Sequence, residues 1–152
     1  MVSRRVVLLG ILSAGPARAE TWHRWRSPRF NVWMEFPARF GAGPVQEDTT
    51  RLNAADGAAL LVYARANEAY GSFDAFKRFV LATLRQDAPR ATQAEGERWL
   101  SVSGMRGEVL FHERHRMSRD RRVLAGLCVT CPARLQAEYR PILRRMSHSL
   151  TM

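Results

Sequence analysis

The segment His112-Glu113-Arg114-His115 carries the side chains that come nearest to a metal-binding motif in this sequence. In the helical motif H-E-x-x-H, two histidines four residues apart share one face of a helix and bind zinc together. Here the histidines are three residues apart in a segment with the pattern of a strand, so they would point to opposite faces of a sheet. The spacing therefore favours structural or solvent-exposed histidines, and we predict no metal ion and no other cofactor.

Cys128 and Cys131 are the two cysteines of the chain. Their C-x-x-C spacing is that of a redox pair, but such a pair lies at the start of a helix, which lowers a thiol pKa. Residues 124–131 have the pattern of a strand, in which these side chains would lie about 10 Å apart on opposite faces, too far for a disulfide. Two small side chains on a strand are therefore favoured over a redox site.

The motifs of common nucleophilic and phosphate-binding enzymes are missing from the sequence. The Ser-Val-Ser-Gly segment at 101–104 lacks the Gly-x-Ser-x-Gly pattern and the strand-to-helix turn that expose a catalytic serine. No Gly-x-x-x-x-Gly-Lys loop occurs. Glu95 and Glu97 are close in sequence, but nothing predicts a cleft that would separate their pKa values, as an acid–base pair requires. We therefore predict no catalytic residue.

A run of arginines is the first candidate for binding a partner. Guanidinium groups bind carboxylates and phosphates through paired hydrogen bonds, so an anionic partner could dock at the predicted hairpin end that carries them. The alternative is a solvated loop in a protein rich in arginine. The candidate residues are Arg114, His115, Arg116, Arg119, Arg121 and Arg122.

The aromatic and basic segment at 22–26 is the second candidate. It contains Trp22 and Trp25, and tryptophan is enriched at the hot spots of protein interfaces. The alternative is that these aromatic side chains hold the segment against the rest of the domain. Either role makes the segment part of the folded protein.

The first 19 residues predict export. Arg4 and Arg5 form a positive start, residues 6–12 form a short apolar run, and Ala17-Arg18-Ala19 fits a cleavage site, which together are typical of a signal peptide. The apolar run is far shorter than the roughly 20 residues of a membrane span. We predict cleavage after Ala19, no stable membrane anchor, a periplasmic or secreted location, and a single domain over residues 20–152.

The charge of the chain limits the classes of partner. Its formal net charge is +10, from 24 basic and 14 acidic residues, and Lys77 is the only lysine. An exported basic protein meets anionic lipids, cell-wall polymers and acidic proteins, whereas nucleic acid is the usual partner of a basic cytoplasmic protein. We therefore predict a protein partner or an anionic envelope partner and no nucleic acid.

The elements that must position these residues follow the order strand, hairpin, helix, three-stranded meander and helix. Asp56-Gly57 and Ser103-Gly104 predict turns, and Pro141 should either start the last helix or kink it. This order predicts an α+β fold, an α/β/α sandwich with a central, mostly antiparallel sheet of about six strands covered by helices. The predicted strands are 30–36, 49–53, 58–66, 98–103, 108–115 and 122–131, and the first helix is 72–86.

A set of short landmarks spans nearly all of residues 20–152. The landmarks are Arg29-Phe30-Asn31-Val32, Phe36-Pro37, Asp56-Gly57-Ala58, Leu61-Val62-Tyr63, Trp99, Val102-Ser103-Gly104, Phe111, Cys131-Pro132, Tyr139, Pro141-Ile142 and Met146-Ser147-His148-Ser149-Leu150. In this order they resemble the PsbP-like superfamily. The resemblance implies a sandwich used mainly as a binding or assembly module, without shared catalytic residues. We therefore expect a non-catalytic module that acts on a protein partner in the cell envelope. Binding of a small molecule or lipid, and a hydrolase with an unconventional site, are the alternatives.

Overall fold

The structure is a computed structural model that describes residues 19–152. The predicted signal peptide, residues 1–19, lies outside the described residues except for Ala19. Within the part of the chain that the structure describes, every helix is too short or too polar to cross a membrane.

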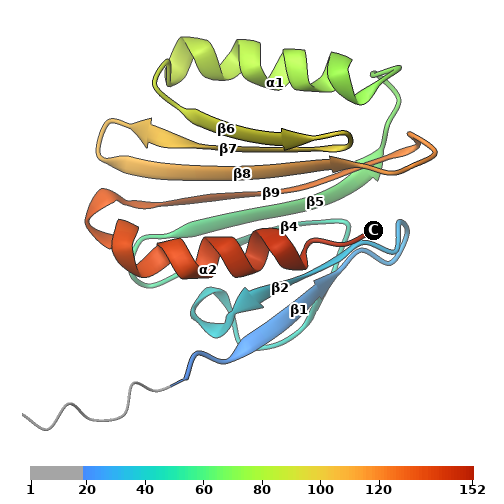
Figure 1. The fold of residues 1–152 in the computed structure, drawn as a ribbon. Coiled ribbons are helices and arrows are strands. Elements are labelled where there is room, and N and C mark those ends of the chain that lie inside the picture. The colour runs from blue at the N-terminus through green and yellow to red at the C-terminus, as the bar shows by residue number, and fades with distance from the viewer. Residues whose placement is uncertain (1–18) are drawn as a thin grey trace, which may run out of the picture.

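A six-stranded antiparallel sheet forms the centre of the fold (Figure 1). Its strands are β4 (Thr49–Asn53), β5 (Ala59–Ala66), β6 (Thr92–Gly96), β7 (Trp99–Arg106), β8 (Val109–Met117) and β9 (Val123–Pro132). They lie in the order β4-β5-β9-β8-β7-β6. The long strands β5, β8 and β9 are therefore neighbours in the middle of the sheet, and most of the side chains discussed below come from them.

A smaller sheet is built from the N-terminal part of the described chain. It has the order β2-β1-β3, with β1 antiparallel to β2 and parallel to β3. Short 3₁₀ helices follow β2 and β9. These elements are β1 (Trp22–Arg26), β2 (Trp33–Pro37), β3 (Val45–Gln46), η1 (Ala38–Phe40) and η2 (Ala133–Leu135).

The first helix, α1 (Phe73–Asp87), confirms the helix predicted at residues 72–86. The Ser72 hydroxyl accepts a hydrogen bond from the backbone N–H of Ala75 at 3.2 Å and so caps the first turn. Asp74 lies in the same turn, where the helix dipole favours a negative charge. The apolar side chains that recur along one side of the helix are buried, and they are Phe73, Phe76, Val80 and Leu84.

The second helix, α2 (Gln136–Ser149), contains Pro141 in its interior. The predicted alternative in which Pro141 starts the helix is therefore wrong. A proline inside a helix costs about 3 kcal/mol, but each large apolar side chain that is buried contributes about 1.5–3 kcal/mol. Four such side chains of α2 are buried, so packing outweighs the proline. They are Tyr139, Ile142, Leu143 and Met146.

The two helices pack on opposite faces of the central sheet, as the side chains of β9 demonstrate. Leu124 belongs to a buried cluster with α1, whereas Leu127 and Val129 belong to a cluster with α2. Side chains an odd number of positions apart on a strand point to opposite faces. We name these the α1 face and the α2 face. The small sheet packs on the α2 face through Trp25 and Phe36, and the predicted α+β sandwich is confirmed.

One predicted strand belongs to a different sheet from the one expected. Residues 30–36 were expected to form the first strand of the central sheet, but β2 begins at Trp33 and pairs with β1 in the small sheet. The central sheet still has six strands because β6, which was not predicted, forms its outer edge. Nearly all of β6 is exposed, so its sequence lacks the alternation that marks a half-buried strand.

The turn predicted at Ser103-Gly104 lies further along the chain. β7 continues to Arg106, and the turn falls at Gly107, which has a positive φ of 60°. Gly104 is an interior strand residue, where an added Cβ would lie 2.9 Å from the ring of Phe111. This glycine marks a close approach between neighbouring strands instead of a turn.

Candidate functional site

The α1 face of the central sheet is only partly covered by its helix. α1 packs on β7 and β8, against Leu100, Val102 and Phe111. Figure 1 shows the helix lying along the β6–β7 edge of the sheet. Towards β4 and β5, a groove of about 470 Å³ separates the helix from the same face of the sheet. This groove is the candidate functional site.

The groove has one apolar wall and several basic groups. Phe79 of α1 lines it with 56% of its surface exposed, and Leu61 of β5 lies on the sheet side. Arg51, Arg65 and Arg106 come from β4, β5 and β7 and add three guanidinium groups. The groove can therefore contact an apolar group and an anionic group at once.

A chain of hydrogen bonds forms the polar floor of the groove. The Tyr63 hydroxyl lies 2.8 Å from Nδ1 of His115, and Nε2 of His115 lies 3.0 Å from a carboxylate oxygen of Glu113. A neutral His115 satisfies both bonds if Nε2 carries the proton and donates it to Glu113 while Nδ1 accepts from Tyr63. The ring of His115 also meets the edge of Phe76 at a centroid distance of 5.5 Å.

Gly126 allows this contact, although Tyr63 and His115 lie on strands that are not neighbours. Both residues pair with Gly126 on the intervening strand β9. A Cβ at Gly126 would lie 2.8 Å from the Tyr63 hydroxyl oxygen and 2.8 Å from the backbone oxygen of Arg114. The missing side chain therefore leaves the space through which Tyr63 reaches across β9 to His115.

The charges around the floor favour an ionised Glu113. The hydrogen bond from His115 lowers the pKa of Glu113, against the effect of burial, and Arg106 contributes from 3.7 Å. Burial raises the pKa of the Tyr63 hydroxyl well above its ordinary value. Burial, and to a smaller extent the negative charge of Glu113, raise the pKa of Cys128 to about 12. In the unliganded protein Cys128 is a thiol at neutral pH and is not an activated nucleophile.

Cys128 completes a cluster with Glu113 and His115 on the α1 face. Glu113 pairs directly with Cys128 across the β8–β9 ladder, and His115 lies two positions further along β8 on the same side. One potential ligand atom from each of the three side chains lies within 4.8 Å of the others. Across residues 19–152, this is the one group of three such side chains at that spacing.

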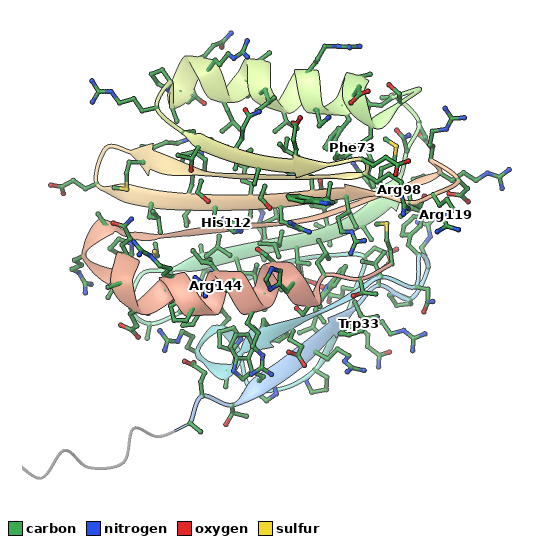
Figure 2. The ribbon with its side chains drawn as sticks, in the orientation of Figure 1. Trp33, Phe73, Arg98, His112, Arg119 and Arg144 are labelled. Atoms are coloured by element: carbon green, nitrogen blue, oxygen red, sulfur yellow. The ribbon has the colours of Figure 1, made fainter. Side chains whose placement is uncertain are left out.

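His112 lies on the α2 face, as the strand pattern predicted for two histidines three residues apart. Its Nδ1 lies 2.6 Å from the Ser103 hydroxyl and its Nε2 lies 2.6 Å from the Ser147 hydroxyl of α2. Burial lowers the pKa of His112 to about 4, so the ring is neutral. Nε2 therefore ties β8 to α2, whereas Nδ1 bonds to the neighbouring strand β7. Figure 2 labels His112 on the sheet close to α2.

The two cysteines lie on opposite faces of β9, which confirms the prediction from their spacing. Cys131 is buried in the cluster with α2, and both thiols are free. The sheet therefore separates the two sulfur atoms, as expected for side chains three positions apart on a strand.

A second groove, of about 520 Å³, lies beside the end of β5 and is lined mainly by polar residues. Two of its polar side chains, Asp48 and Asn67, already bond within the protein. Asp48 accepts from the Ser27 hydroxyl at 2.5 Å, and the Asn67 amide donates to the backbone oxygens of Tyr70 and Arg121 at 2.7 Å. These bonds tie loops together, so we assign this groove a structural role.

The three arginines of the β8–β9 turn remain together at the surface. Arg119, Arg121 and Arg122 are exposed, and Figure 2 shows Arg119 extending from the end of the hairpin. Asp120 is the one acidic residue between them. Its carboxylate accepts from the Ser118 hydroxyl at 2.6 Å and from the backbone N–H of Arg122 at 3.0 Å, so it is engaged within the turn.

The other members of the predicted basic set lie elsewhere. Arg114 is half-buried on the α2 face, with its guanidinium 4.1 Å from the ring centre of Trp99. Arg116 donates a hydrogen bond to the backbone oxygen of Leu150 at 2.5 Å. His115 points to the opposite face, into the groove. The structure therefore divides the predicted six-residue site among three places.

Trp25 is not a surface residue, which corrects its assignment to a binding patch. It is fully buried, and its indole N–H donates to the Thr50 hydroxyl at 3.2 Å. Trp22 is half-buried, with the guanidinium of Arg145 lying 4.1 Å from its ring centre. The alternative interpretation describes this segment, because β1 is a strand whose aromatic side chains hold it against the domain.

Comparison of the chain with models of known protein families and with curated proteins gives no match. The resemblance to the PsbP-like superfamily therefore stays a prediction from the sequence.

Sequence reasoning did not identify the groove residues Tyr63, Glu113 and Arg106 as partners. They come from three strands, and only the strand order brings them together. A usable signal was present in the alternation of β5 and β8, which places Tyr63 and His115 on one face once β9 is known to lie between them. That pairing cannot be read from either segment alone.

Proposed function

We propose that the domain is a non-catalytic binding protein whose groove beside α1 takes a small amphipathic molecule with an acidic head group. Of the functions expected from the sequence, this is the small-molecule or lipid-binding alternative. The observation that carries the proposal is the combination of an exposed Phe79 with three guanidinium groups in one groove.

The size and lining of the groove suit such a molecule. A volume of about 470 Å³ lies within the range of small-ligand sites, roughly 300–1,000 Å³. An alkyl chain would lie between Phe79 and Leu61, where burial of each CH₂ contributes about 0.8 kcal/mol. Arg51 and Arg65 are exposed at the same groove and would hold the head group by charge-assisted hydrogen bonds.

The chemistry of the floor supports binding over catalysis. Burial keeps the Cys128 thiol and the Tyr63 hydroxyl protonated, because it raises both pKa values. Glu113 and His115 bond to each other, which engages the group that would otherwise act as a base. The floor therefore supplies fixed polar contacts and lacks an activated nucleophile among the described side chains.

Calorimetric titration with dodecanoate tests the proposal. We expect saturable binding with a stoichiometry near one, and much weaker binding of the uncharged methyl ester. The double substitution Arg51→Gln and Arg65→Gln should weaken dodecanoate binding about 10- to 100-fold, since a hydrogen bond to a charged group contributes about 1.5–3 kcal/mol. Phe79→Asp should weaken it by removing the apolar wall.

A matched pair of substitutions away from the groove provides the control. Arg119→Gln and Arg122→Gln remove the same charge at the β8–β9 turn. If this control weakens dodecanoate binding as much as the groove variant does, the effect is general attraction to a basic protein and the groove assignment fails. Equal binding of dodecanoate and its methyl ester would also contradict the proposal.

The β8–β9 turn supports a second candidate function, docking of a protein or other anionic partner from the cell envelope. Three exposed guanidinium groups gather there, and the one carboxylate among them is engaged by the turn itself. Replacing Arg119, Arg121 and Arg122 by glutamine should weaken binding to anionic liposomes or to a captured acidic partner. Unchanged binding would remove the turn from consideration.

We also propose that the protein acts after export, in the periplasm or outside the cell. The support is the signal-peptide pattern of residues 1–19. Mass spectrometry of the protein from the envelope fraction of its host should give a chain that begins at Glu20. An uncut chain recovered from the cytosol would contradict this location.

A further inference from the structure

Glu113, His115 and Cys128 are three potential metal ligands that lie together, and binding of an amphipathic anion does not require them. We propose that these three side chains bind a divalent transition-metal ion of the zinc class. The inference concerns the floor of the groove and does not rest on the proposed organic ligand.

The geometry of the strands brings the three ligands together. Glu113 and Cys128 are directly opposite on β8 and β9, and His115 follows two positions along the same side of β8. Their ligand atoms lie within 4.8 Å of one another. Metal–ligand bonds of about 2.0–2.3 Å in a tetrahedral site place ligand atoms about 3.3–3.8 Å apart, so rotations that move side-chain atoms by about 1 Å suffice.

The hydrogen bonds around the cluster leave the required ligand atoms available. Arg106 approaches one oxygen of Glu113 at 3.7 Å, whereas the other oxygen of Glu113 faces Nε2 of His115 at 3.0 Å. A metal ion between that oxygen and Nε2 would replace this one hydrogen bond. The ion pair with Arg106 would keep the carboxylate in place.

Tyr63 gives His115 the support that a metal-binding imidazole usually has. Its hydroxyl lies 2.8 Å from Nδ1, on the far side of the ring from Nε2. When Nε2 binds a metal, Nδ1 carries the proton and donates it to the Tyr63 oxygen. Such partners orient the imidazole and strengthen its binding to the ion. Gly126 serves the metal site as well, since it leaves room for Tyr63.

The ligand types favour zinc-class ions over magnesium or calcium. A thiolate and an imidazole are soft or intermediate ligands, whereas magnesium and calcium prefer oxygen alone. The carboxylate and the thiolate together balance the charge of a divalent ion. Binding would release the proton of Cys128, since a coordinating thiol is deprotonated.

The fourth position of the metal ion would open towards the groove. Glu113 and His115 both line it, and Cys128 pairs with Glu113 on the neighbouring strand β9. A site with three protein ligands and one open position accepts water or a ligand oxygen. The structure thus assigns the groove a floor that can coordinate an incoming oxygen atom, beside the arginines that can bind its charge.

Titration of the reduced, chelator-treated protein with Co²⁺ tests this inference. A bound thiolate gives a sulfur-to-cobalt charge-transfer band in the near ultraviolet, and we expect this band to saturate at one ion per chain. Cys128→Ser should abolish the band. The matched control is Cys131→Ala, which removes the thiol of the opposite face and should leave the band unchanged.

Two further variants keep the test decisive. Glu113→Gln should weaken cobalt binding even if Cys128→Ser proves poorly folded by circular dichroism. Tyr63→Phe should weaken it about 10-fold while the band keeps its position, the loss usual for a partner of a metal-binding histidine. Absence of the band in the wild-type protein, or an undiminished band in Cys128→Ser, would overturn the assignment.

The proposed metal site and the proposed ligand groove can be contradicted independently of each other. Arg51→Gln with Arg65→Gln should change the cobalt affinity far less than Cys128→Ser does, because neither residue is among the three ligands and, of the two, only Arg51 acts on Cys128 through its charge. Dodecanoate binding without a cobalt band would retain the proposed function and reject the metal. The reverse result would retain the metal and reject the amphipathic ligand.

Discussion

His112 and His115 lie three residues apart on one strand, yet the two faces of the sheet give them different environments. His112 is partly exposed on the α2 face, with both ring nitrogens bonded to serine hydroxyls. His115 lies at the floor of a groove on the α1 face, between Tyr63 and Glu113. His115 is the more deeply buried ring, with 6% of its surface exposed. The partners that each face supplies, more than the depth of burial, therefore distinguish the two histidines: neutral hydroxyls hold His112, whereas a carboxylate that borders the groove holds His115.

Of the substitutions considered, Gly126→Ala should reduce the free energy of unfolding most, because it disturbs the contact between Tyr63 and His115. The added methyl group would lie 2.8 Å from the Tyr63 hydroxyl oxygen and 2.8 Å from the backbone oxygen of Arg114. Both distances are too short, so the side chain or the strand must move. We expect a loss of up to about 3 kcal/mol in the free energy of unfolding, the upper part of the range for overpacking. Denaturant unfolding measures it. Gly71→Ala is the control, since its Cβ would meet no atom within 4 Å.

His112→Ala should destabilise the protein by about 1–3 kcal/mol, because the buried Ser147 hydroxyl and the half-buried Ser103 hydroxyl lose their partner. His115→Ala should cost at least as much, because the ring is only 6% exposed and its removal leaves the Tyr63 hydroxyl and the Glu113 carboxylate without their partner. Thermal unfolding of both variants compares the two faces. A clearly smaller loss for His115→Ala would mean that water in the groove replaces the ring as a partner of Tyr63 and Glu113.

The α2 face should also be sensitive to acid through Asp56. Burial raises the pKa of Asp56, but hydrogen bonds from the Ala58 N–H and the Tyr139 hydroxyl, together with Arg39, lower it below its ordinary value of 3.8 overall. A carboxyl with a depressed folded pKa stabilises the protein above its unfolded pKa and loses that contribution as the pH falls.

Thermal melting between neutral pH and about pH 3 tests this, because an unfolded aspartate titrates near 3.9. Asp56→Asn should be less stable than the wild type at neutral pH and should lose less stability on acidification. If both proteins lose the same amount, the bonds of Asp56 do not contribute to the attachment of α2.

The smallest expected effect belongs to the β8–β9 turn. Replacing Arg119 and Arg122 by glutamine should change the unfolding free energy by no more than about 0.5 kcal/mol, since exposed side chains outside specific contacts contribute little. Denaturant unfolding measures this change. A larger loss would mean that these arginines stabilise the hairpin, and would weaken their assignment to partner binding.

The elements with strong periodicity could be predicted from the sequence. The apolar spacing of α1, the Ser72 cap and the Asp56-Gly57 turn are local signals, and the structure contains all three. β6 lacked such a signal because its residues are exposed on both sides. Gly104 was wrongly predicted to form a turn, because the sequence does not distinguish a glycine required for close strand packing from a glycine required for a positive φ.

The candidate site could be predicted only in part. The alternation of β8 placed His112 and His115 on opposite faces, and that of β9 separated the two cysteines. The contact between Tyr63 and His115 depends on β9 lying between β5 and β8 and on Gly126 lacking a side chain. Pairing between strands distant in sequence is a property of the whole sheet, so neither segment contains it.

The position of Cys131 on the other side of β9 from Cys128 has a consequence for biogenesis. Because the sheet lies between the two sulfur atoms, the native fold contains no disulfide between them. Folding therefore requires neither an oxidant nor disulfide exchange. The chain should recover its structure from denaturant at the same rate with or without dithiothreitol. It can therefore mature in an oxidising or a reducing environment alike, independently of the enzymes that install disulfides.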